Sequence, residues 1–154
     1  MIRVLLFLLA AASARACIDD RFIESLAVKE TGGRTGLIGD KHLREYSYGR
    51  WQIRRVYLED VKRLRGRELE KAGYKNPGLE DVRKDDRLGR LVVELYLGYY
   101  GKAYEKKTGR ALTPEVAFMI HNGGPRGWDK GVRHHPAARA YAASAMSIYR
   151  KTRG

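Results

Sequence analysis

The chain has 154 residues, a length that suits one domain with a single hydrophobic core. Its apolar fraction of 44% is ordinary for a folded protein and argues against intrinsic disorder. Cys17 is the single cysteine, which excludes an intramolecular disulfide and a zinc site built from several cysteines.

Residues 1–16 predict a secretory signal peptide, because a basic start at Arg3 is followed by an apolar run over residues 4–12 and then by small residues. This run is far shorter than the ~20 residues of a membrane-spanning helix, and a buried N-terminal helix is the alternative. We therefore expect these residues to be removed and the protein to be exported, either secreted or periplasmic. Cleavage beside Cys17 leaves a lipoprotein as a further alternative, although Arg15 fits such a signal poorly.

The positive charge of the chain predicts an anionic partner. Removal of Arg3 and Arg15 with the leader leaves 29 basic residues against 18 acidic ones, a net charge of +11. Such a charge attracts polyanions over a long range, and both nucleic acid and an anionic cell-wall or membrane surface are candidates. Export favours the wall or membrane surface, so we expect no specific nucleic-acid partner, and we expect a monomer.

Residues 17–154 are expected to form one domain of the α+β class that is predominantly α-helical. The spacing of apolar residues, with caps and glycine or proline stops, predicts helices at about residues 19–31, 50–64, 86–107, 114–121 and 136–149, and one or two short helical turns within 66–82. The longest of these is the predicted central helix, with a core stripe of Leu88, Leu91, Val92, Leu95, Tyr99 and Ala103. The glycine-rich residues 34–49 predict a small irregular hairpin, called the tongue below, between the first two helices.

Glu30 is the candidate for acid–base chemistry. Ile23, Ala27 and Glu30 lie at positions i, i+4 and i+7 of the first helix, so Glu30 continues the buried stripe of that helix. Desolvation of a carboxyl group disfavours its charged form, and a protonated glutamate is what a general acid needs. The alternative is a glutamate that turns to solvent near the end of a helix, as most helical glutamates do.

Four short blocks give Glu30 a context. They are Glu30-Thr31-Gly32-Gly33 at the end of the first helix, Gly39-Asp40 in the tongue, Gly49-Arg50-Trp51-Gln52-Ile53 after it, and His121-Asn122-Gly123-Gly124-Pro125. In this order and spacing they resemble the family of soluble lytic transglycosylases and goose-type lysozymes, which shares the lysozyme-like fold. The fourth block departs from the family's pattern, with His121 for a tyrosine and Gly123 for an alanine. The resemblance covers about residues 20–130.

The resemblance implies a lysozyme-like catalytic domain with Glu30 as the acid/base. It also implies that Gln52 and the backbone of Gly49 line the substrate cleft, that Asn122 shapes the floor facing Glu30, and that His121 borders the cleft. Further expected substrate contacts are Thr31, where the family usually has serine, Asp40 in the tongue, and Tyr48, whose ring can stack on a sugar. For Trp51 a place in the core is the favoured interpretation.

The expected reaction is cleavage of the MurNAc–GlcNAc β-1,4 bond of peptidoglycan. An inverting hydrolase needs a second carboxylate to activate water, whereas a lytic transglycosylase uses a hydroxyl of the substrate and needs one carboxylate. Asp40 and Glu45 are candidates for the second group, but neither is unambiguous, so transglycosylation is favoured. The alternatives are a lysozyme-type hydrolase and a non-catalytic basic protein that binds the wall or another polyanion.

No cofactor or metal is expected. His134 and His135, with Asp129 nearby, offer too few ligands at a recognisable spacing for a metal site. The expected partners are peptidoglycan glycan strands, implied by the resemblance, and an anionic wall or membrane surface, implied by the net charge.

Overall fold

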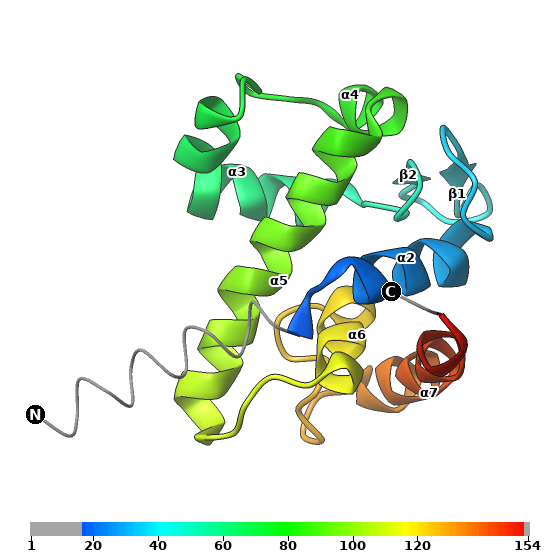
Figure 1. Ribbon diagram of the computed structural model, residues 1–154, viewed down its shortest axis with the longest axis vertical. Coiled ribbons are helices and arrows are strands. Elements are labelled where there is room, and N and C mark those ends of the chain that lie inside the picture. The colour runs from blue at the N-terminus through cyan, green and yellow to red at the C-terminus, as the bar shows by residue number, and fades with distance from the viewer. Residues whose placement is uncertain (1–16, 153–154) are drawn as a thin grey trace, which may run out of the picture. The chain divides into compact units, whose positions relative to one another are not determined.

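The computed structural model describes residues 17–152, so the signal-peptide prediction for residues 1–16 lies outside the described residues, as do residues 153–154. The described chain is mostly helical, with six helices and one two-stranded antiparallel sheet (Figure 1), which confirms the predicted helical class with its small hairpin. The elements in chain order are α2 (Asp20–Thr31), β1 (Ile38–Gly39), β2 (Ser47–Tyr48), α3 (Arg55–Lys71), α4 (Leu79–Lys84), α5 (Asp86–Thr108), α6 (Pro114–Gly123) and α7 (His135–Lys151). Between residues 17 and 152, no helix is both long and apolar enough to cross a membrane.

The chain forms two compact units. One consists of residues 27–96 and is called the α3–α4 unit; the other joins residues 17–26 to residues 97–152 and is called the α6–α7 unit. Both divisions fall inside helices, because α2 and α5 each contribute one end to each unit.

The α6–α7 unit is organised around two helices that lie side by side (Figure 1). Phe22 of α2 stacks on Phe118 of α6 with ring centroids 4.4 Å apart, and both side chains are fully buried. The guanidinium of Arg21 lies over the ring of Tyr149 near the end of α7, 4.2 Å from its centroid. Helix α7 packs closely because its inner face carries small buried residues, namely Ala138, Ala142 and Ala145.

Short-range contacts set several helix ends. A carboxylate oxygen of Asp19 accepts a hydrogen bond of 2.8 Å from the backbone N–H of Phe22, at the start of α2. Thr113 caps α6 in the same way by accepting from Val116, and a proline follows it at the first helical position. Gly109 has a φ of 69° after the end of α5, a left-handed conformation that favours glycine.

Helix α3 differs from its predicted bounds of 50–64, since it begins at Arg55 and continues to Lys71. It begins late because Tyr48 and Ile53 exchange two backbone hydrogen bonds of 2.9 Å, which hold the residues between them in a turn. It ends late because the chain passes through a kink at Arg65, with φ −136°, and remains helical. Of the short turns predicted within residues 66–82, only α4 is a separate helix.

Helix α5 has the predicted bounds, but its buried face is rotated from the predicted stripe. Tyr99 and Ala103, both placed on the core face from sequence, are exposed, and Leu91 and Leu95 are only partly buried. The helix is apolar around much of its circumference, so the sequence alone left its inward face ambiguous. Its buried large side chains are Leu88, Val92, Val93, Tyr96, Leu97 and Tyr104.

Cys17, the first described residue, is partly buried in the α6–α7 unit. Burial raises the pKa of its thiol to about 12, and the negative charges of Asp19 and Glu105 add to the rise. The thiol is therefore protonated, and a poor nucleophile, at neutral pH.

Candidate functional site

Glu30 is half-buried in the last turn of α2, in the α3–α4 unit. The helix ends directly after it, as predicted, because Gly32 and Gly33 have φ values of 64° and 81°. In that conformation their N–H groups turn back to the helix, Gly32 donating to the carbonyl of Val28 (2.9 Å) and Gly33 to that of Ala27 (3.1 Å). The end of α2 is thus defined by its own backbone, and Glu30 is held at a definite place.

Thr31, the last residue of α2, connects this helix end to the tongue. It is 5% exposed, and its hydroxyl lies 2.9–3.1 Å from the carbonyl oxygens of Ala27, Arg34 and Arg50. A hydroxyl has one proton to donate, so these three carbonyl oxygens share a single donor. The geometry gives Thr31 a positioning role, and its predicted contact with substrate stays a prediction.

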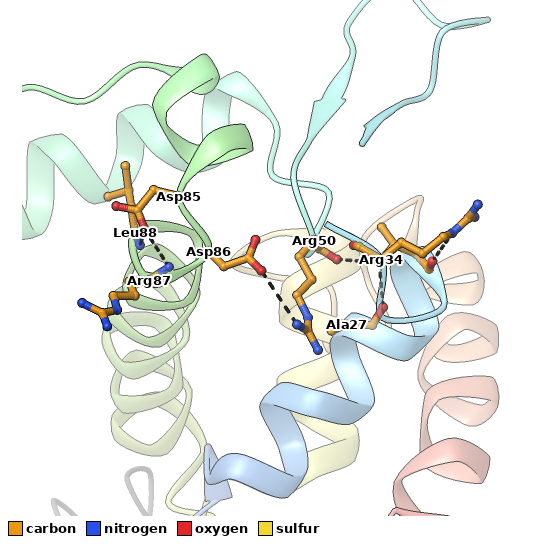
Figure 2. Close-up of polar contacts among 8 residues, drawn as sticks. Ala27, Arg34, Arg50, Asp85, Asp86, Arg87 and Leu88 are labelled. Carbon is orange, nitrogen blue, oxygen red and sulfur yellow. Dashed lines mark hydrogen bonds and ion pairs between the residues drawn. The ribbon is translucent and has the colours of Figure 1, made fainter. Parts of the chain in front are cut away.

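Arg50 extends this connection to α5. Its carbonyl accepts from Thr31, while its guanidinium lies 3.8 Å from a carboxylate oxygen of Asp86 in the first turn of α5. Figure 2 shows the two side chains pointing toward each other. The end of α2, the segment after the tongue and the start of α5 therefore meet through Thr31, Arg50 and Asp86.

Asp86 is a carboxylate that sequence reasoning missed. Two acidic residues at a helix start are typical of helix capping, and Asp85 has that role, accepting from the N–H groups of Arg87 (2.8 Å) and Leu88 (3.2 Å) (Figure 2). Because Asp85 caps the helix, Asp86 is left to face Arg50. The sequence did carry a signal for Asp86: it is the second acidic residue at the start of α5, and capping requires only one.

Two stacked tyrosines lie near Glu30. The rings of Tyr57 on α3 and Tyr96 on α5 are nearly parallel, with centroids 3.5 Å apart, and Tyr57 is only 7% exposed. Burial raises the pKa of Tyr57 well above its usual value, and both Tyr96 and the Glu30 carboxylate add to the rise. Glu30 thus acts electrostatically on the buried phenol, which stays neutral.

Gln52 is built into the base of the tongue. Its amide oxygen accepts a hydrogen bond of 2.6 Å from the hydroxyl of Ser47, and its amide nitrogen donates to the carbonyl of Gly49 at 2.9 Å. A Cβ atom on Gly39 would lie 1.7 Å from the Gln52 amide oxygen, so glycine at that position makes room for the amide. These contacts give the side chain a structural role; its predicted contact with substrate stays a prediction.

Gly49 and Trp51 pack the tongue against the helices. Gly49 is buried with a φ of 75°, and a Cβ atom there would lie 3.0 Å from the carbonyl oxygen of Val82 in α4. Trp51 is buried, with its ring against Gly89 of α5, which confirms the core interpretation. The backbone of Gly49 therefore lies where only glycine fits without strain.

The tongue also carries the other sequence candidates, Asp40 and Tyr48. Asp40 accepts a hydrogen bond of 2.9 Å from the guanidinium of Arg54. Tyr48 is half-buried and lines a cavity of about 300 Å³, which we call the tongue cavity. The residues that line this cavity are Arg44, Glu45, Tyr46, Tyr48, Arg55 and Leu79.

His121 and Asn122 lie in the last turn of α6, in the α6–α7 unit. The ring of His121 faces that of Tyr141, with centroids 6.4 Å apart, and Asn122 is exposed. Their predicted places around Glu30 stay predictions.

The histidines considered as metal ligands lie elsewhere in this unit. Nδ1 of the buried His135 lies 2.9 Å from the carbonyl oxygen of Gly127. Residues 17–152 hold no cluster of three or more His, Cys, Asp or Glu side chains suited to a metal ion.

Glu30 therefore combines three properties that acid–base chemistry uses: a carboxyl group, partial burial and a backbone held by neighbouring elements. Comparisons of the chain with protein-family models, with curated proteins and with solved structures find no match.

Proposed function

We propose that this protein cleaves the glycan strands of peptidoglycan at the MurNAc–GlcNAc β-1,4 bond, with Glu30 as general acid and base. The observation that carries the proposal is the place of Glu30: it is half-buried at a defined helix end, beside the Thr31–Arg50–Asp86 connection and within electrostatic reach of Tyr57. The resemblance of the four sequence blocks to lytic transglycosylases and goose-type lysozymes supports the same role.

The lysozyme-like fold is part of this proposal. A helix that ends in the candidate acid, a short hairpin after it, and a set of further helices are what that fold requires. The Gly39, Gly49 and Gln52 positions support it further, because all three shape the hairpin.

Lytic transglycosylation is the favoured reaction. Glu30 gives its proton to the bridging oxygen as the bond from C1 of MurNAc to that oxygen breaks, and then takes the proton of the C6 hydroxyl as O6 bonds to C1. The products are a 1,6-anhydro end and a free hydroxyl on the leaving sugar, and no water is consumed. One carboxylate suffices, which agrees with Asp40 and Asp86 being engaged by Arg54 and Arg50.

The first alternative is a hydrolase of the same bond. It would need Asp40, Glu45 or Asp86 to activate water, with the carboxylates of an inverting enzyme ~6.5–9.5 Å apart. The second alternative is a basic wall-binding protein without activity, which uses the net charge alone and predicts salt-sensitive binding with no cleavage.

Mass spectrometry of the soluble products from purified peptidoglycan separates these candidates. The proposal predicts fragments with 1,6-anhydro ends, and a hydrolase would give reducing ends that are heavier by one water. Binding to the wall that decreases with salt and releases no fragments would favour the binder. Transglycosylation and hydrolysis both depend on Glu30, so the Glu30→Gln variant should release no fragments by either reaction.

A further inference from the structure

Basic side chains gather on two segments of the α6–α7 unit, the end of α5 and the loop between α6 and α7. Residues 105–110 and 126–133 carry six basic and two acidic side chains, and we call these two segments the basic end. The six cations are all exposed, and they are Lys106, Lys107, Arg110, Arg126, Lys130 and Arg133. These two short segments thus carry +4 of the net charge of +11 that remains without the leader.

Trp128 joins the two segments into one surface. Its ring lies nearly perpendicular to that of Tyr104 in α5, with centroids 5.1 Å apart. The ammonium group of Lys107 lies over the Trp128 ring, 5.5 Å from its centroid. The indole N–H donates to the carbonyl of Pro125 at 3.1 Å, which fixes the ring within its own loop. The loop before α7 is therefore held against the end of α5.

Most cations of the basic end have no counterion, while its acids are engaged. Four of the cations make no hydrogen bond or ion pair within residues 17–152, namely Lys106, Arg110, Lys130 and Arg133. Asp129 pairs with Arg126, and a carboxylate oxygen of Glu105 accepts from the backbone N–H of Leu112 at 2.9 Å. The positive charge of this surface is therefore left for a partner outside the described chain.

The basic run of helix α3 has the opposite arrangement. Lys62, Arg63 and Arg65 each pair with a carboxylate three residues away on the same helix. Such pairs offset their own charge locally and leave a weaker field for an external anion. The number of basic residues alone therefore does not mark the basic end; the absence of counterions does.

Trp128 narrows the class of anionic partner. Lys107 lies over its ring and Tyr104 packs against it, so the ring is not an open platform for stacking a nucleic-acid base or a sugar. Lysines and arginines around a half-buried tryptophan, which has an apolar body and a polar N–H, are instead typical of surfaces that meet a membrane interface. A bilayer also presents many phosphates in one plane, which suits cations that come from two separate segments.

The first described residue lies near the basic end. Besides burial and Asp19, the negative charge of Glu105 raises the pKa of the Cys17 thiol, so residue 17 is close to the end of α5. The apolar run of residues 4–12 precedes Cys17 by a few positions in the sequence. The leader that is expected to bring this chain to a membrane is thus attached beside the basic end.

We propose that the basic end is a docking surface for an anionic phospholipid membrane, with Lys106, Arg110, Lys130 and Arg133 contacting lipid phosphates around Trp128. Docking of this kind keeps the protein at the membrane face after the leader is removed, and it does not depend on glycan cleavage. Because the attraction is electrostatic, binding weakens as salt is added. Each cation near an anionic bilayer strengthens binding by about fivefold.

Co-sedimentation of the full chain with sucrose-loaded vesicles tests the proposal. One probe is a vesicle with equal parts of phosphatidylglycerol and phosphatidylcholine, and the other is a vesicle of phosphatidylcholine alone. We expect salt-sensitive binding to the anionic vesicles, and about 100-fold weaker binding when Lys106→Gln, Arg110→Gln and Arg133→Gln are combined. Arg133→Gln alone should weaken binding about fivefold, which tests the surface even if the triple variant does not fold. Residues 1–16 are the same in every variant, so the differences report the basic end.

The matched control combines Arg63→Gln, Arg67→Gln and Lys71→Gln, which removes two arginines and one lysine from exposed positions of α3. It lowers the net charge equally and should bind the anionic vesicles within about threefold of wild type. Equal weakening of the two triple variants, unchanged binding of the Arg133→Gln variant, or equal binding to both kinds of vesicle would overturn the proposal. Binding of soluble polyphosphate without binding of vesicles would assign the surface to a polymer and overturn it as well.

Discussion

The base and the tip of the tongue use their residues in opposite ways. In the base, which we define as Gly39 and residues 47–49 of the tongue together with the turn 50–53 that follows, the Gln52 amide is hydrogen-bonded at both ends and the backbone of Gly49 packs on α4. In the tip, residues 40–46, every side chain except that of Asp40 is exposed, and Arg44 lines a cavity without a counterion among residues 17–152. The base is therefore held by its own contacts, whereas the tip is mostly exposed.

Gly39→Ala is the most damaging small change that this comparison predicts. The new Cβ would lie 1.7 Å from the Gln52 amide oxygen, so the amide must leave its partners or the strand must shift. We expect the free energy of unfolding to fall by ~1–3 kcal/mol in urea denaturation. Gly66→Ala is the control, since a Cβ there meets nothing within 4 Å in helix α3, and it should be neutral or stabilising. Equal stability of Gly39→Ala and wild type would remove the steric role of Gly39.

Thr31→Val tests the connection between α2 and the tongue base. Valine has nearly the same shape but cannot donate to the carbonyls of Ala27, Arg34 and Arg50. The expected loss is ~1–2 kcal/mol in the free energy of unfolding, because carbonyl groups that are buried or partly buried lose a hydrogen-bond donor. Thr35→Val, at an exposed position, should change it by less than ~0.5 kcal/mol. If the two variants were equally stable, the hydroxyl of Thr31 would have no positioning role.

Tyr57→Phe should change the pH dependence of stability in alkaline solution. The pKa of Tyr57 is raised in the folded state, so the unfolded chain loses this proton first, near pH 10, and the stabilisation is lost as pH rises above that value. Above pH 10, titration of this group should lower the free energy of unfolding of the wild type by ~1.4 kcal/mol per pH unit. The variant should lack that contribution. Denaturant unfolding at pH 8, 9, 10 and 11 measures it. Parallel curves for the two proteins would contradict the burial of the phenol beside Glu30.

The smallest effect on stability is expected at the tip. Leu43→Ser and Tyr46→Ser remove exposed side chains, so each should change the free energy of unfolding by less than ~0.5 kcal/mol in the same urea assay. A loss comparable to that of Gly39→Ala would mean that the tip also supports the fold, and would end the distinction between base and tip.

Local signals allowed most element boundaries to be predicted. Asp19 and Thr113 cap helices within three residues of their own position, and the glycines after Thr31 and Thr108 end helices through their own backbone conformation. The predicted start of α3 was wrong because the Tyr48–Ile53 bridge keeps residues 49–52 out of the helix. That bridge has no strong signature in the local sequence. The prediction of which face of α5 points inward was wrong because apolar residues surround much of this helix.

The sequence could place Glu30 at the end of α2 but could not give the residues that surround it. Glu30 could be placed because its position on the α2 stripe is a property of one helix. The Arg50–Asp86 and Tyr57–Tyr96 contacts join residues 36 and 39 positions apart, so helical periodicity says nothing about them. The role of Gln52 in the tongue base was missed for a similar reason, since it depends on the space above Gly39.

The central claim is that Glu30 is the acid/base of a glycan-cleaving enzyme. The direct measurement is the rate of turbidity loss of purified cell walls with wild type, Glu30→Gln and Glu24→Gln, after circular dichroism has shown that all three are folded. Glu24 is the matched control because it is an exposed glutamate on the same helix. The account predicts a loss of at least ~100-fold for Glu30→Gln and the wild-type rate for Glu24→Gln. Wild-type activity in Glu30→Gln, or no activity in the wild type itself, would contradict it.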